Sequence, residues 1–167
     1  HMQYKTALLV ILIMLGITGG ISWLYIAQGE KNEDKLSKPL LGEKMPDLGR
    51  QHVAKEAPHT AYNSNPPTSG PHWAGVAGPG INTEPVPDEL VFHSMEHGAA
   101  VVWYREGLDP GEIEKIKEAF SKASGKKIML ARKDLYVPVA LTSWGYLLKL
   151  ETVDEAKIID FIETNND

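Results

Sequence analysis

The sequence predicts an α+β fold: a small mixed or antiparallel sheet with two helices packed on it, preceded by an N-terminal transmembrane helix and a long ordered Pro/Gly-rich loop. Three observations lead to this prediction. An uncharged apolar stretch occupies residues 7–28, proline and glycine are dense between residues 39 and 88, and short apolar runs alternate with amphipathic segments after residue 90. This order of elements is typical of a sheet covered by helices on one side.

The apolar stretch from Ala7 to Gln28 predicts an uncleaved membrane anchor. It has roughly the 20 residues that a helix needs to cross a hydrocarbon core of about 30 Å. Lys5 precedes it, and Trp23 and Tyr25 lie near its far end like interfacial aromatic residues. A cleaved signal peptide is the alternative, but its apolar region usually has about 7 to 15 residues and ends at a site flanked by small residues.

Three regions follow from this anchor. Residues 1–28 form the anchor, beginning with His1 and Met2, which we interpret as a cloning remnant. Residues 29–38 are polar and form a tether, and residues 39–167 form one domain. With Lys5 inside, the chain is a single-pass protein of the cytoplasmic membrane whose domain faces outside the cytoplasm.

The segment from residue 39 to 88 contains too much proline for a helix or a long strand. Disorder is not expected, because Tyr62, Trp73 and Val76 are interspersed and proline stiffens the backbone. We expect an ordered loop that wraps the core and holds ligands.

Regular elements follow from residue 90. Apolar and β-branched runs predict strands over 99–104, 128–131 and 137–142, and a possible fourth over 143–150. Asp109 and Pro110 open a helix that ends before Ser124, since a capping residue followed by proline is typical of a helix start. The residues from Thr152 to Glu155 match a capping box for a C-terminal helix.

Composition excludes several kinds of function. The chain has no Cys, which rules out disulfides, thiolate metal sites and blue copper, and leaves His, Met and carboxylates as ligands. The formal net charge is -5, so no basic surface is expected to hold nucleic acid.

Metal-capable side chains are densest at His93-Ser94-Met95-Glu96-His97. A helical turn would bring His93 and His97 within about 6 Å, whereas a strand would hold them about 13 Å apart. The stiff turn before His72 brings a third imidazole, and Met95 or Glu96 adds a fourth donor. Three His with a thioether favour copper, our first choice, and three His with a carboxylate or water favour zinc.

Other interpretations of these residues stay open. His52 is a further candidate, as a ligand or as a hydrogen-bond partner of one. His93 and His97 can also be structural residues buried under the loop, with Glu96 pairing one imidazole. The letters His-x-x-Glu-His match the inverted metallohydrolase motif, but that motif needs a long helix, and Gly98 followed by a strand-like run argues against one.

Three segments resemble a known family. Residues 49–53 (GRQHV), 65–72 (NPPTSGPH) and 90–98 (LVFHSMEHG) are similar to the signature of the DUF3105 domain family, and the resemblance extends from about Met45 to the C-terminal helix. It implies a membrane-anchored or secreted protein of bacteria or archaea and implies no particular activity.

The sequence therefore predicts a membrane-tethered extracytoplasmic metal-binding protein, with copper binding or delivery through His72, His93, His97, Met95 and His52. The first alternative is a non-metal interaction domain whose loop contacts another envelope protein. The second is a zinc-dependent hydrolase, and we expect a binding protein rather than an enzyme. The sequence does not predict an oligomeric state.

Overall fold

A computed structural model describes residues 2–166 of the chain. It divides into two compact units, His1–Pro39 and Leu40–Asp167. His1, which we interpreted as part of a cloning remnant, lies outside the described residues, and so does the side chain of Lys5 on which the expected orientation rests.

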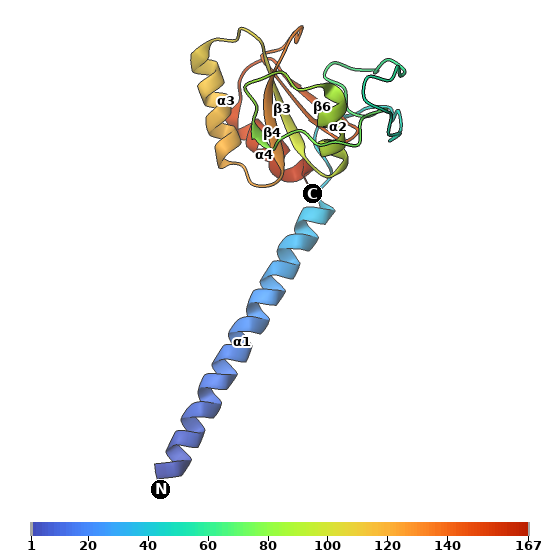
Figure 1. The fold of residues 1–167 in the computed structure, drawn as a ribbon. Helices are drawn as coiled ribbons and strands as arrows, with labels where there is room; N and C mark the ends of the chain where they lie inside the picture. The colour runs from blue at the N-terminus through green and yellow to red at the C-terminus, as the bar shows by residue number, and fades with distance from the viewer. Residues whose placement is uncertain (1, 167) are drawn as a thin grey trace. The chain divides into compact units, whose positions relative to one another are not determined.

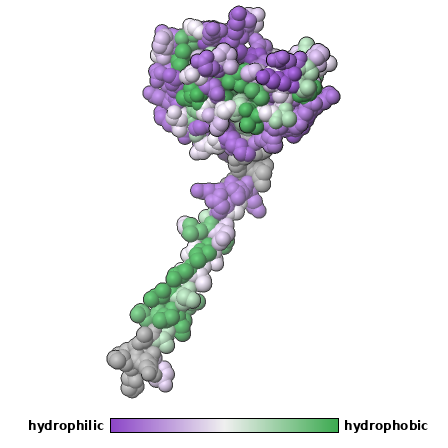
Figure 2. Space-filling view, in the orientation of Figure 1, coloured by the Kyte–Doolittle hydropathy of each residue, from purple (hydrophilic) through white to green (hydrophobic). Residues whose placement is uncertain are grey.

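The first unit is one helix, α1 (Met2–Ser37), coloured blue in Figure 1. By length and composition its segment Ala7–Glu33 is able to cross a membrane, a test that a signal sequence also passes. Figure 2 shows apolar surface along much of the helix and polar surface toward its C-terminal end. The helix continues through the predicted tether, because Glu and Lys are good helix formers and no proline occurs before Pro39.

The second unit contains a six-stranded mixed sheet in the order β1-β6-β5-β3-β4-β2. The central strand β3 runs parallel to β4 and antiparallel to β5. The two edge strands are only two residues long. The strands are β1 (Glu43–Lys44), β2 (Gly80–Ile81), β3 (Ala100–Arg105), β4 (Lys127–Arg132), β5 (Val139–Ser143) and β6 (Tyr146–Leu150).

Helices cover both faces of this sheet. One face packs on α3 (Pro110–Lys122) and α4 (Glu155–Asn165) through Val102 and Met129. The other face packs on α2 (Asp88–Glu96) through Val101 and Trp103. Figure 1 shows α2 and α3 on opposite sides of the strands. The alternation of neighbouring residues between the two cores is the two-residue period of a strand.

The predicted α+β class is confirmed, and two local details differ from expectation. Asp109 caps α3 as predicted, with its side chain 2.9 Å from the backbone nitrogen of Gly111. The cap of α4 is Asp154 rather than Thr152, and it accepts from the backbone nitrogen of Lys157 at 3.1 Å. The single turn expected at residues 93–97 is the C-terminal end of the longer helix α2. This helix packs on the second face of the sheet.

The Pro/Gly-rich segment is ordered against this second face. Residues 66–72 are all buried. The hydroxyl of Tyr62 donates to the carbonyl of Pro71 at 2.8 Å, and its ring centroid lies 4.6 Å from that of Phe92 on α2. The loop therefore forms part of the core and carries His72 to the N-terminal side of β3.

Candidate metal centre

A short backbone bridge places His52 beside His72. The backbone nitrogen of His72 donates to the carbonyl of Gln51 at 3.0 Å, and that of Val53 donates to the carbonyl of His72 at 2.8 Å. The two imidazole centroids are 4.9 Å apart. Two segments separated by twenty positions thus present their rings to the same space.

Helix α2 supplies His93 and Glu96. Residues three apart on a helix share one face, so both side chains point toward the bridge formed by His52 and His72. The helix is fixed at its N-terminus by a bidentate ion pair, in which the Arg132 guanidinium donates to Asp88 at 2.7 and 3.1 Å. The helix therefore holds the two potential metal ligands, His93 and Glu96, in fixed positions.

The four side chains form one compact group around Glu96. One oxygen of Glu96, Oε2, lies 3.0 Å from His72 Nε2, 3.5 Å from His52 Nε2 and 3.7 Å from His93 Nδ1. One potential ligand atom from each residue lies within 4.8 Å of the others. Ligand atoms about 2.1 Å from a tetrahedral ion are about 3.4 Å from one another, a value that these three distances bracket.

The tautomer of His72 follows from its two contacts. Its Nδ1 lies 2.9 Å from the carbonyl oxygen of Gly70, which only accepts, so Nδ1 carries the hydrogen. The lone pair of the neutral ring is then on Nε2, which faces Oε2 of Glu96 at 3.0 Å. Two acceptors at this distance require a proton or a metal cation between them. The His72 side chain is fully buried.

His93 contributes a buried donor atom without a hydrogen bond. Its Nδ1 has no hydrogen-bond partner among residues 2–166 and lies 3.7 Å from Oε2 of Glu96. Burial, together with the neighbouring imidazoles of His97, His52 and His72, lowers the pKa of His93, so its neutral form is favoured. A neutral imidazole is the form that ligates metal ions.

Glu96 is ionised despite its partial burial. Burial opposes ionisation, but the contacts of the carboxylate with the imidazoles of His72 and His52 and the charge of Arg50 outweigh it and lower the pKa of Glu96 below its usual range. The Arg50 guanidinium lies 3.9 Å from Oε1 of Glu96 and is stacked 4.8 Å over the ring of Trp144. The group thus combines three imidazoles and one carboxylate.

The structure brings together only part of the predicted ligand set. His52, His72 and His93 lie in the group, and the carboxylate is that of Glu96. His97 lies outside it, because it follows the last residue of α2 and its exposed ring is stacked edge-on against His93 at 4.7 Å. Met95 also lies outside it: the side chain faces the sheet, and its sulfur accepts from the Thr142 hydroxyl at 3.3 Å.

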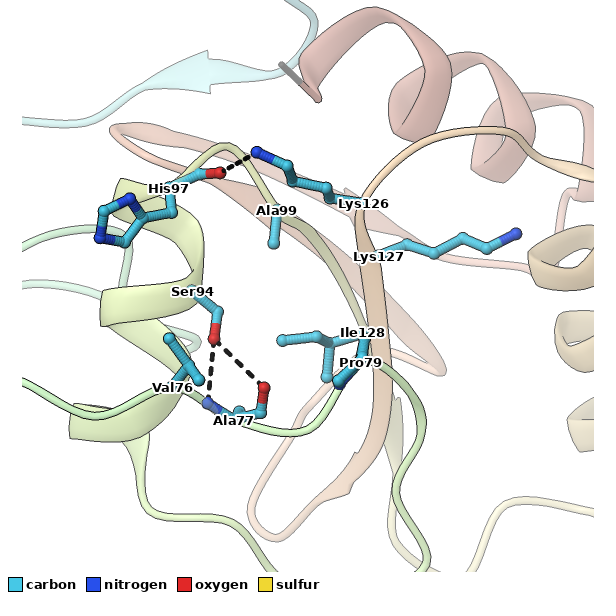
Figure 3. Close-up of a pocket in the computed structure, with 9 residues that line it drawn as sticks. All are labelled: Val76, Ala77, Pro79, Ser94, His97, Ala99, Lys126, Lys127 and Ile128. Atoms are coloured by element: carbon cyan, nitrogen blue, oxygen red, sulfur yellow. Dashed lines mark hydrogen bonds between the residues drawn. The ribbon is translucent and has the colours of Figure 1, made fainter.

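His97 and Ser94 instead border a small, largely apolar cavity between α2 and β4, shown in Figure 3. The Ser94 hydroxyl is directed at the backbone of Ala77, from which it accepts at 3.0 Å. The carbonyl of His97 accepts from Lys126 at 2.9 Å. The motif therefore has two faces, of which only the one with His93 and Glu96 belongs to the candidate centre.

Arg50 is the residue of this site that sequence patterns did not single out. It precedes His52 by two positions, and its role depends on the long-range pairing of residues 48–53 with residues 69–72. No periodicity within either segment indicates that pairing. The only sequence signal is the basic residue next to a His in the segment GRQHV.

A family model described as "Protein of unknown function (DUF3105)" matches residues 52–167. The matched region includes His52, His72, His93 and Glu96 and begins two residues after Arg50. Neither a curated protein nor a solved structure matches the chain.

Proposed function

Since the chain belongs to the DUF3105 family, whose description assigns no activity, we propose its function from the site itself: it is a membrane-tethered protein that binds a divalent transition-metal ion. The ligands are His52, His72, His93 and Glu96. The observation that carries this proposal is the placement of buried His72, whose Nδ1 is held by the Gly70 carbonyl and whose Nε2 faces a carboxylate oxygen 3.0 Å away. An ion between these two acceptors would satisfy both.

Nitrogen and carboxylate ligands suit zinc or copper(II). The thioether that favoured reduced copper is that of Met95, which is buried in the core and hydrogen-bonded there. Divalent copper remains a candidate because it binds imidazole sites more tightly than zinc. The ligand set therefore supports a divalent ion. The affinities of the protein for Zn²⁺ and for Cu²⁺ distinguish the two candidates.

The exposure of the ligands supports reversible loading. The His52 side chain is 49% exposed, whereas that of His72 is fully buried. An ion that enters from solvent meets His52 first and is then bound by the buried donors. We propose binding or delivery of the ion rather than its permanent burial as a structural element.

We also propose that α1 remains attached as the anchor and that the domain faces outside the cytoplasm. The apolar length of α1 supports a membrane span, and the positive-inside rule applied to Lys5 supports the orientation. A reporter enzyme that is active only after export, fused to the C-terminus, tests this directly. Activity is expected; a reporter active only in the cytoplasm would refute the orientation.

The decisive test measures binding of Zn²⁺ and Cu²⁺ to the full chain in detergent by calorimetry, together with thermal unfolding. A bound ion stabilises the fold by about 2.7 kcal/mol at a free concentration 100 times the dissociation constant. His52→Ala, an exposed change, is expected to weaken binding by 10-fold or more and so to remove about half or more of this stabilisation. The matched control is His97→Ala, which should bind like the unmodified chain.

The outcomes separate the alternatives. Absence of binding for both ions, with unfolding unchanged, would refute the metal proposal and support a structural histidine network in an interaction domain. Equal binding in the unmodified chain and in His52→Ala would show that the ion binds elsewhere.

A further inference from the structure

Arg50 lies at the open edge of the candidate centre. Its side chain is 55% exposed, and its guanidinium is 3.9 Å from Oε1 of Glu96. The same guanidinium is stacked over Trp144, whose ring lies 5.7 Å from that of His72. This contact holds the guanidinium beside the ligands.

The N–H groups of Arg50 have no hydrogen-bond acceptor in the described part of the chain. The contact with Glu96 is longer than a hydrogen bond, and no acceptor within residues 2–166 is hydrogen-bonded to the Arg50 guanidinium. A guanidinium presents five N–H donors in a planar fork that matches two oxygens of a carboxylate or a phosphate. Arg50 is therefore held in place without a bidentate acceptor.

The charges of the loaded site also favour an anion. A divalent ion, the Glu96 carboxylate and the Arg50 guanidinium leave a double positive charge when the three imidazoles are neutral. Two of the proposed ligands lie away from solvent, since His72 is fully buried and His93 is 12% exposed, while the third imidazole, His52, lies with Arg50 at the solvent edge. A further ligand of the ion would approach from this solvent edge, within reach of Arg50.

Resting on the proposed metal site, we infer that the loaded protein binds an oxyanion, a carboxylate or phosphate group, shared between the ion and Arg50. One oxygen of the anion would join the four protein ligands as the fifth ligand of the ion, and the remaining oxygens would accept from the guanidinium. Arg50 is thus a specificity residue that selects which anion binds to the metal ion. The ligand is a small oxyanion or a molecule with a terminal carboxylate or phosphate.

The test uses the full chain in detergent loaded with one equivalent of Co²⁺, whose visible absorption depends on its ligands. Acetate and inorganic phosphate are titrated separately, and the absorption change gives a dissociation constant for each. Arg50→Ala is expected to weaken anion binding by about 10- to 100-fold. Arg50→Lys keeps the charge but loses the fork, so its loss should be intermediate. The matched control is Arg105→Ala, an exposed arginine at the opposite end of β3.

The readouts separate this inference from the metal proposal. Cobalt binding is measured first in each variant, and the Arg50 variants should bind it within a few-fold of the unmodified chain. Cobalt binding without any spectral response to acetate or phosphate would overturn the oxyanion inference and leave the metal site intact. An anion response of equal affinity in Arg50→Ala would overturn the role of Arg50. Loss of cobalt binding in the unmodified chain would refute the metal proposal itself. Of the two anions, the one whose affinity depends more on Arg50 identifies the oxyanion class.

Discussion

Gly70 controls the orientation of His72 at the scale of a single residue. Its φ of +132° is rarely adopted by residues with a side chain, and an added Cβ would lie 3.0 Å from two ring carbons of Tyr62. That ring cannot move aside easily, because it is packed on Phe92 and hydrogen-bonded to Pro71. The backbone at Gly70 therefore determines where the carbonyl that holds His72 Nδ1 is directed.

Gly70→Ala is expected to lower the free energy of unfolding by about 2 kcal/mol, through backbone strain and the clash with Tyr62. Metal affinity should fall as well, because the His72 ring loses its fixed tautomer. Gly49→Ala is the matched control: its φ is +87°, but no atom lies within 4 Å of the added Cβ, so only the strain of about 1 kcal/mol is expected. Chemical denaturation and calorimetry measure the two effects, and equal losses in both variants would contradict the proposed clash.

His59 gives a prediction about pH that is independent of the metal ligands. Its Nδ1 donates to the carbonyl of Thr60 at 2.9 Å, and its Nε2 lies 3.1 Å from Glu89. The bond to Thr60 and the pairing with Glu89 raise the pKa of His59 above its ordinary value of about 6.5. Protonated His59 stabilises the folded state in full at pH values below that ordinary pKa. This stabilisation is lost as the pH rises through the raised pKa of the folded state.

The comparison is between the unmodified chain and His59→Gln, both with a chelator present. The unmodified chain should be more stable by up to about 1 kcal/mol at pH 5.5, and this difference should be smaller at pH 9. Urea unfolding at the two pH values measures it. A stability difference that grows with pH would contradict the assigned protonation.

The residues of the site were only partly predictable from the sequence. The spacing of His93 and the stiff turn before His72 pointed to a shared centre, and both rings lie in the candidate group. His97 was assigned from its four-residue spacing, and its backbone nitrogen does donate to the carbonyl of His93 at 3.2 Å, as in a helix. Its exposed ring is stacked against the ring of His93 and does not join the group around Glu96. The side-chain direction of Met95 depends on which face of α2 meets the sheet, and local sequence does not reveal this.

At the scale of elements, one arginine of β4 positions α2. The Arg132 guanidinium donates to both carboxylate oxygens of Asp88, is hydrogen-bonded to Asn65 and lies 4.8 Å over the ring of Trp103. Arg132→Lys should lower the free energy of unfolding by about 1 to 3 kcal/mol, because a lysine makes one point contact in place of the fork and the stacked plane. Denaturation measures this, and Lys115→Ala in the exposed pair with Glu112 should change little. No loss in Arg132→Lys would mean that packing alone fixes α2.

The elements whose signals are local were predictable. Asp109 and Pro110 mark the start of α3, and the run from Ala99 to Tyr104 corresponds to β3 with a shift of one residue. Helix α2 was predicted only as a turn, because Gly98 and the strand after it indicated a short element. The bridge between His52 and His72 was not predictable, because a pairing across the loop depends on tertiary packing rather than on residue pattern.

At the scale of the whole molecule, α1 is long and apolar enough to attach the chain to a membrane. The full chain should stay in the membrane fraction after washing with high salt and alkaline carbonate, because its apolar stretch is long enough to span the hydrocarbon core. A chain that begins at Leu40, the first residue of the second compact unit, should be released in folded form. Fractionation and circular dichroism measure these outcomes. Intact mass of the membrane-extracted protein detects removal of residues 1–28, which would contradict the uncleaved anchor.

The bridge between His52 and His72 has a consequence for folding in a chain that cannot form a disulfide. An ion bound by His52 and His93 would act as a removable cross-link, tying the segment around His52 to α2, the helix that follows the proline-rich segment. Closing a loop of this size with a covalent link is worth about 3 to 5 kcal/mol in the chain-entropy picture. Binding of the metal ion would therefore slow backbone hydrogen exchange most between residues 48 and 72 and leave exchange in α3 and α4 almost unchanged. The region that binds the ion would then also be the region whose local unfolding the ion suppresses.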